Sequence, residues 1–239
     1  MKKIESVNNF RVTQWVKLKD KVKRDSAGEF IAEGYHLVSE AYKTGYLKEV
    51  ITTENKEFND VPTYCVRDEV MKKISSLATP TKMIGICRQM ERKKYAGNVL
   101  LLDQIHHPGN LGTIIRSAAA FNIDTVILNE SVDIYNQKVI QATQGMLFHL
   151  NVINASLKDS ILDLKKDGYQ IIGTDVRDGV DLDRFTAASK HAILVGNEGN
   201  GLGDDLLSLC NVKVNIKMNP VCESLNVGVA AGIILYRLK

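Results

Sequence analysis

Three short stretches of the sequence combine amide, carboxylate or guanidinium side chains with glycine or with a hydroxyl side chain. They are NLGTIIR at residues 110–116, GNEGNG at residues 196–201 and SLN at residues 224–226. Three glycines in six residues permit positive φ angles and a close approach of backbone to a ligand. Arg116 lies in a run otherwise rich in Ile and Ala, so we expect it to have a partner or to point into a cleft. Together the stretches predict a ligand site.

Each stretch also has a simpler explanation. Asn110 is a suitable N-cap for the helix that follows it, and Arg116 could form a surface ion pair. The glycine stretch could be a flexible turn between a strand and a helix. Ser224 could cap a final helix over 224–238, which is worth about 1 kcal/mol. Capping needs one residue, however, so Asn226 is left at the start of a largely apolar helix, where a buried amide requires partners.

The elements that must position these stretches alternate between strand and helix. After residue 97 we expect strands at 99–102, 125–128, 169–173, 191–195 and 212–216, with helices at 110–121, 156–167 and 224–238. This alternation predicts a largely parallel sheet covered on both faces. Each of the three stretches follows a strand, where open α/β sheets bind their ligands.

The first part of the chain predicts a smaller α/β unit. We expect helices at 9–24, 35–44 and 68–76, and strands at 30–32, 49–53, 61–66 and 83–88, followed by a polar linker at 89–98. In the first helix, Phe10, Trp15, Val16 and Val22 supply the apolar side. Residues 1–95 carry 19 Lys and Arg against 13 Asp and Glu, a net +6, whereas residues 96–239 carry 12 against 15, a net −3. This division favours a polyanion-binding module joined to a different core.

Several classes of protein are disfavoured. No stretch approaches the roughly 20 apolar residues of a membrane span, and no export signal is evident, so we expect a cytoplasmic protein without membrane contact. The four scattered cysteines form no CxxC pair and predict free thiols and no metal site. Neither a dinucleotide GxGxxG fingerprint nor a P-loop is present.

The three stretches, in this order and each after a strand, resemble the motifs of the SpoU (TrmH) family of RNA ribose 2′-O-methyltransferases. The first corresponds to N-x-G-x-x-x-R, the second to Gly196-Asn-Glu-Gly-x-Gly201, and the third to Ile216-x-Met218 followed by Ser224-Leu-Asn226. The resemblance covers residues 97–239. Residues 1–92 resemble, more loosely, the ribosomal-protein-like substrate-binding domain of many members.

The resemblance implies an α/β fold whose C-terminal domain forms a deep trefoil knot of the SPOUT type. It implies S-adenosyl-L-methionine as cofactor, no metal, RNA as partner and a homodimer formed through the C-terminal domain. The implied cofactor-binding residues are Thr174, Gly196, Asn197, Gly201, Ile216, Met218 and Leu225. The implied catalytic residues are Arg116, Asn110, Glu198, Ser224 and Asn226.

Two roles remain open for Arg116. It could act as the base toward the ribose 2′-hydroxyl, or it could hold a phosphate and stabilise the developing alkoxide. Ser224 and Asn226 would orient Arg116 or the ribose, and Glu198 would hold the glycine loop or pair with Arg116. His107 and His149 are alternative bases. His106-His107 and Gln144-Gly145-Met146 depart from the usual family pattern, which bears on the choice of substrate.

The function predicted is methylation of a ribose 2′-hydroxyl in structured RNA. Ribosomal RNA of the 23S type is favoured over tRNA because the N-terminal part resembles that of rRNA-modifying members. Two alternatives are a non-catalytic RNA-binding or ribosome-assembly protein of the same fold, and an unrelated α/β enzyme whose glycine loop binds phosphate.

Overall fold

The computed structural model describes residues 1–91, 93–176 and 178–239. The chain forms two compact units. The first contains residues 1–91 together with Gln144–His149, and the second contains residues 93–143 and 150–239. The domain boundary predicted at residue 92 lies outside the described residues.

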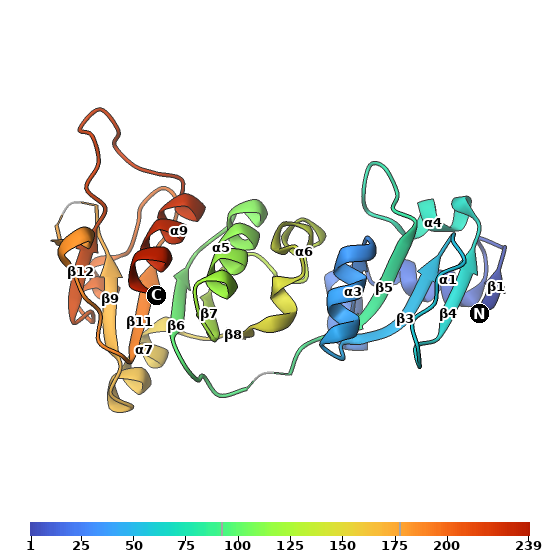
Figure 1. The fold of residues 1–239 in the computed structure, drawn as a ribbon, viewed down its shortest axis with the longest axis horizontal. Coiled ribbons are helices and arrows are strands. Elements are labelled where there is room, and N and C mark those ends of the chain that lie inside the picture. The colour runs from blue at the N-terminus through green and yellow to red at the C-terminus, as the bar shows by residue number, and fades with distance from the viewer. Residues whose placement is uncertain (92, 177) are drawn as a thin grey trace. The chain divides into compact units, whose positions relative to one another are not determined.

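The first unit is built on a five-stranded mixed sheet with the strand order β1-β4-β3-β5-β2 (Figure 1). The strands are β1 (Lys2–Ile4), β2 (Glu29–Glu33), β3 (Leu47–Thr52), β4 (Thr63–Val66) and β5 (Met83–Arg88). Strands β1, β4 and β3 are parallel, and β5 is antiparallel to both of its neighbours. Helices α3 (Tyr35–Lys43) and α4 (Asp68–Ile74) agree with the helices predicted at 35–44 and 68–76.

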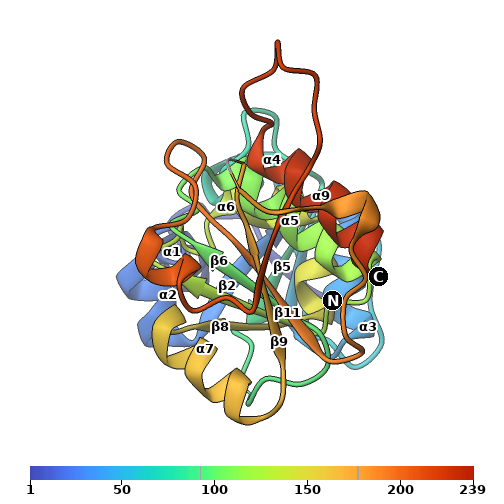
Figure 2. The ribbon, with the colours of Figure 1, turned by 90° about the vertical axis from the view of Figure 1, so that its left-hand side faces the viewer.

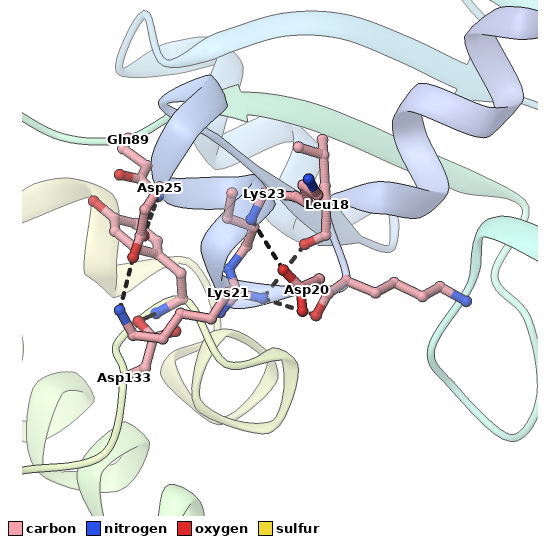
Figure 3. A network of polar contacts seen from close by, with 10 residues as sticks. Leu18, Asp20, Lys21, Lys23, Asp25, Gln89 and Asp133 are labelled. Atoms are coloured by element: carbon pink, nitrogen blue, oxygen red, sulfur yellow. Dashed lines mark hydrogen bonds and ion pairs between the residues drawn. The ribbon is translucent and has the colours of Figure 1, made fainter.

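The helix predicted over 9–24 is two helices, α1 (Phe10–Lys17) and α2 (Lys21–Ala27). The buried side chain of Arg24 donates to the carbonyl oxygen of Leu18, the C-cap of the first helix, at 3.4 Å and to that of Lys19 at 2.9 Å. Asp20 begins the second helix by accepting from the backbone N–H of Lys23 at 3.0 Å (Figure 3).

The predicted apolar side is wrong at both of its ends. Trp15 is buried, but Phe10 is 75% exposed and Val22 is 71% exposed. Val22 lies on α2, so one helical periodicity counted over 9–24 assigned it to a face of the wrong helix, whereas Phe10 is the exposed first residue of α1 itself.

The segment Gln144–His149 packs with the first unit although its sequence neighbours belong to the second. It contains the 3₁₀ helix η1 (Met146–His149). The ring of Phe148 stacks on those of Phe30 and Tyr46, with centroids 6.0 Å apart in both pairs. The stretch Gln144-Gly145-Met146, which departs from the usual family pattern, therefore belongs to the first unit.

The second unit is built on seven parallel strands in the order β10-β12-β9-β11-β6-β7-β8. They are β6 (Val99–Asp103), β7 (Thr125–Asn129), β8 (Asn151–Asn154), β9 (Gln170–Thr174), β10 (Val180–Asp181), β11 (His191–Val195) and β12 (Val212–Asn215). The predicted α/β fold with a parallel sheet is confirmed. The sequence analysis missed β8, β10, α6 (Gln137–Thr143) and α8 (Asp204–Leu207).

Helices cover both faces of this sheet (Figure 2). Helix α7 (Leu157–Lys166) buries Leu157, Ile161 and Leu164 against one face. Helices α5 (Pro108–Ala120) and α9 (Val227–Leu238) cover the other face. α5 lies so close to α6 that a Cβ atom on Gly112 would stand 2.3 Å from Cβ of Ala142.

The order of the strands determines where the site forms. β12, β9, β11 and β6 are consecutive neighbours and run parallel, so the loops that follow them leave from one edge of the sheet. The glycine stretch and Ser224–Asn226 lie in two of these loops, and residues 110–116 lie in helix α5, which begins directly after a third. No helix among the described residues is long and apolar enough to cross a bilayer. The trefoil knot stays a prediction.

Candidate active site

The glycine loop after β11 is closed by its own hydrogen bonds. Asn197 and Gly201 exchange two backbone hydrogen bonds of 3.1 Å, and the Asn197 side chain accepts from the N–H of Gly199 at 2.8 Å. The same side chain donates to the carbonyl oxygen of Gln104 at 2.9 Å, which joins the loop to the segment after β6. A Cβ atom on Gly196 would lie 2.4 Å from the backbone of Gly201. The loop is therefore a tightly built turn that requires glycine.

Asn110 connects this loop to the last helix. Its side-chain amide donates to Oε1 of Glu198 at 3.0 Å, and its Oδ1 accepts from the side-chain amide of Asn226 at 3.0 Å. Helix α5 begins at Pro108, so Asn110 lies inside the first turn and is not the N-cap. We call these three side chains, Glu198, Asn110 and Asn226, the amide bridge.

Asn226 also has the capping role that the sequence analysis gave to Ser224. Helix α9 begins at Val227, and Oδ1 of Asn226 accepts from the N–H groups of Gly228 at 2.9 Å and Val229 at 3.4 Å. The expected cap at Ser224 is wrong. Ser224 lies two residues before the cap, in an exposed segment that projects from its unit (Figures 1 and 2).

The carboxyl group of Glu198 is stabilised in its charged form. Burial opposes the charge, but the hydrogen bonds from Asn110 and from backbone N–H groups, including that of His107, outweigh burial and lower the pKa of Glu198. Glu198 is therefore a carboxylate at neutral pH that accepts hydrogen bonds.

Arg116 is exposed and makes no hydrogen bond or ion pair with the described residues. Within residues 1–91, 93–176 and 178–239, Arg116 forms neither the surface ion pair nor the pairing with Glu198 considered from the sequence, and Glu198 accepts from Asn110 instead. The guanidinium of Arg116 therefore remains available to an external partner.

The loops enclose a cavity of about 350 Å³ at the carboxyl edge of the sheet. All seven residues assigned to the cofactor line it: Thr174, Gly196, Asn197, Gly201, Ile216, Met218 and Leu225. Glu198 and Ser224 also line it, whereas Asn110, Arg116 and Asn226 do not. Asn110 and Asn226 belong to the amide bridge, Glu198 belongs to both the bridge and the cavity wall, and Arg116 belongs to neither.

Sequence reasoning missed part of the cavity wall. Val227, Ala230 and Ile234 line it from α9, at a spacing that places them on one side of a helix. Asp175 lines it from the end of β9, directly after Thr174. The position of Asp175 after a parallel strand was the signal that could have identified it.

The two candidate histidines are placed differently. The backbone N–H of His107 donates to Glu198 at 3.4 Å, so this residue contacts the amide bridge through its main chain. The His149 ring lies in the first unit, with Nε2 at 2.9 Å from Oε2 of Glu40.

The sequence and the fold are similar to those of known proteins. The sequence profile of the SpoU rRNA Methylase family matches residues 97–236, and that of the MRM3-like substrate binding domain matches residues 9–85. The chain belongs to the SpoU rRNA methylase family. The resemblance seen in the sequence is thereby confirmed.

Three similar proteins match this SpoU methylase over nearly its whole length. The 23S rRNA (guanosine(2553)-2′-O)-methyltransferase RlmP of Bacillus subtilis is 34% identical over 100% of both chains. The AdoMet-bound rRNA methyltransferase from Sinorhizobium meliloti is 27% identical with a TM-score of 0.88, over 99% of this chain and 96% of that one. AviRb from Streptomyces viridochromogenes, in complex with AdoMet, is 25% identical with a TM-score of 0.83, over 96% and 97%.

The lowered pKa of Glu198 predicts a pH-dependent contribution to stability. Because the pKa is lower in the folded chain, the carboxylate stabilises the fold above the ordinary value of 4.5 and loses this effect as the pH falls through the folded value. Wild type should melt at a higher temperature than Glu198→Gln at neutral pH, and the difference should shrink in acid. The measurement is thermal melting from about pH 7 to about pH 3.

Glu223→Gln is the matched control, because the exposed side chain of Glu223 makes no hydrogen bond or ion pair with the described residues. Its melting difference from wild type should not vary with pH in this way. A Glu198→Gln difference that stays constant over the whole range would contradict the assignment.

Proposed function

We propose that this chain transfers a methyl group from S-adenosyl-L-methionine to a ribose 2′-hydroxyl of 23S-type ribosomal RNA. The observation that carries the proposal is the cavity formed together by the glycine loop, the segment before α9 and the end of β9, with Glu198 of the amide bridge in its wall. The 34% identity with a 23S rRNA 2′-O-methyltransferase over both complete chains supports ribosomal RNA over tRNA.

The cavity fits the cofactor by size and by chemistry. Small-molecule sites commonly have volumes of roughly 300–1,000 Å³ and mostly apolar walls with few polar groups. Here Val195, Leu202 and Val214 supply apolar wall, while the tight turn at Gly196 exposes backbone to the cavity. When bound, S-adenosyl-L-methionine supplies a methyl group on a sulfonium leaving group.

The residues of the chain then have to position the ribose and stabilise charge on its oxygen. A guanidinium does not give up its proton under ordinary conditions, which favours Arg116 as a phosphate-binding and alkoxide-stabilising group over Arg116 as a base. Its exposure and lack of a partner among the described residues suit contact with RNA. Asn110 and Asn226 hold the beginnings of the two helices in position relative to Glu198 and its loop.

Arg116→Ala should reduce methyl transfer by at least about 100-fold, the usual effect of removing one group that stabilises transition-state charge. Cofactor affinity should stay within about twofold, because Arg116 does not line the cavity. The measurements are incorporation of labelled methyl into ribosomal RNA and calorimetry with S-adenosyl-L-methionine.

Arg184→Ala removes another exposed arginine of the same unit and should leave the rate unchanged. Near-normal methylation by Arg116→Ala would overturn the role given to Arg116.

We also propose that the N-terminal domain, residues 1–92, contributes RNA binding, and that residues 97–239 are the catalytic domain. The net +6 of residues 1–95 supports this, and so does the match to a substrate binding domain. The lysines differ in availability. Lys19 and Lys73 donate to backbone carbonyl oxygens, whereas Lys17 and Lys23 are exposed without a side-chain partner among the described residues.

The double variant Lys17→Gln and Lys23→Gln should therefore weaken RNA binding and flatten its salt dependence. If both ammonium groups contact phosphates, the slope of log K against log salt should fall by about one to two. Filter binding at several salt concentrations measures both quantities. The control, Lys138→Gln with Lys158→Gln, changes the charge of the other unit equally, and an equal effect of both pairs would refute the specific role of the first.

The homodimer is also proposed, through α9. Val229, Ile233 and Tyr236 are 52%, 40% and 59% exposed and lie on one side of this helix. Such an exposed apolar row marks a protein contact. Light scattering should show a wild-type dimer and an Ile233→Asp monomer, and a dimer that survives this change would exclude α9 as the interface.

An enzyme acting on ribosomal RNA would work in the cytoplasm.

A further inference from the structure

Three aromatic rings form an exposed row on the first unit. Tyr35 and Tyr42 are seven residues apart on α3, which places them on one side of the helix, and they are 57% and 37% exposed. Phe58, in the loop 53–62 between β3 and β4, contacts both, with its ring centroid 6.3 Å from that of Tyr35 and 4.9 Å from that of Tyr42. We call these three residues the aromatic row. Helix α3 buries its leucine, valine and alanine side chains instead, so the tyrosines lie outside the core.

The loop that carries Phe58 is held by its own backbone hydrogen bonds. At its start, the N–H of Thr53 donates to the carbonyl oxygen of Lys82 at 3.0 Å. After the ring, the N–H of Val61 donates to the carbonyl oxygen of Phe58 at 3.3 Å. The ring of Phe58 is therefore placed against the two tyrosines before any ligand binds. A preformed surface of this kind loses little conformational entropy on binding.

The charged groups of this loop are balanced. Glu54 pairs with two ammonium groups, with Nζ of Lys82 at 3.1 Å and Nζ of Lys56 at 3.3 Å. The amino terminus of the chain lies 2.9 Å from Oε1 of Glu57. With the exposed Asp60, the three carboxylates of the loop are matched by these three positive groups. The aromatic row therefore offers ring surface rather than net charge.

The chemistry of the aromatic row fits unpaired RNA bases. An unpaired base has an exposed π-face that can stack on an aromatic ring, whereas the bases of a duplex are stacked on one another. The row lies within residues 9–85, which match a substrate binding domain. Residues 1–95 carry a net +6, which attracts a polyanion to this unit. RNA is therefore the partner that both the rings and the surrounding unit favour.

Lys56 is placed to assist a stacked base. Its Nζ lies 5.0 Å from the centroid of the Tyr35 ring, and its side chain is 55% exposed. Because a lysine side chain is flexible, it can leave the ring when a base takes its place and follow the phosphate of the same nucleotide. Tyr35 and Tyr42 are separated by about 10 Å along the helix axis, which equals about three nucleotide steps of a single strand. The row therefore suits a short unpaired segment.

We propose that the aromatic row binds a short unpaired segment of the RNA substrate by base stacking, in addition to the phosphate contacts of the same unit. The first unit then favours RNA that contains a loop or a bulge over a continuous duplex. The inference rests on the proposed action on RNA and adds to it the kind of RNA feature that the first unit recognises.

The test is filter binding of the full chain to two RNA probes with the same number of phosphates, a stem–loop with an unpaired loop and a continuous duplex. The double variant Tyr35→Ala with Tyr42→Ala should weaken binding of the stem–loop at least about fivefold, the effect of losing one stacked base, and binding of the duplex by less than about twofold. The slope of log K against log salt should not change, because no charge is removed.

Two controls separate stacking from other causes. The double variant Tyr35→Phe with Tyr42→Phe keeps both rings and should bind both probes like the wild type. Phe10→Ala removes an exposed ring of the same unit that lies outside the aromatic row, and it should also leave both affinities unchanged. Retained binding of the duplex by the alanine variant shows that its first unit is folded.

Undiminished binding of the stem–loop by the alanine variant, equal weakening with both probes, or an equal loss in the phenylalanine variant would overturn the stacking role. A changed oligomeric state of the alanine variant in light scattering, with undiminished RNA binding, would assign the row to a protein contact instead. If the wild type bound neither probe, the proposed function itself would fail. If it bound both probes and the row made no difference, only this inference would fail.

Discussion

The amide bridge is the interaction on which the arrangement of the site depends. A parallel sheet brings the loops after neighbouring strands to one edge, but it does not set their positions relative to one another. Asn110 does this by donating to Glu198 and accepting from Asn226, which joins the glycine loop, the first turn of α5 and the start of α9. Each such hydrogen bond contributes only about 0.5–1.5 kcal/mol, more where a charged group takes part. Its importance is therefore geometric, since small displacements of positioning groups are costly in catalysis.

Small residues make this bridge possible. A Cβ atom on Gly196 would collide with the backbone of Gly201, and one on Gly112 would collide with Ala142. On α9, a Cβ atom on Gly228 would come within 3.2 Å of Oδ1 of Asn226. Glycine therefore stands where a loop or helix lies too close to its neighbour for a side chain. Asparagine stands where neighbouring elements are joined by side-chain hydrogen bonds. Local sequence and tertiary packing agree at this site, as expected of a sequence that specifies one structure.

Much of the second unit could be predicted because buried parallel strands and the glycine turn leave strong local signals. The seven cofactor residues came from the family resemblance and lie around one cavity. The errors arose where only tertiary contacts decide. Ser224 and Asn226 are equally suitable N-caps by residue type. In the structure Asn226 is the N-cap of α9, and its side chain also donates to Asn110. The break between α1 and α2 depends on Arg24, and the packing of Phe148 with Phe30 joins residues 118 positions apart, which no local pattern reveals.

We propose that this SpoU methylase uses the cavity beside the amide bridge to methylate a ribose of ribosomal RNA. The most direct measurement is a map of 2′-O-methylated nucleotides in total RNA from cells with and without the gene. A ribose methylation in large-subunit ribosomal RNA should disappear with the gene and return with the wild-type gene but not with Arg116→Ala. An unchanged map, or a loss confined to tRNA, would contradict it.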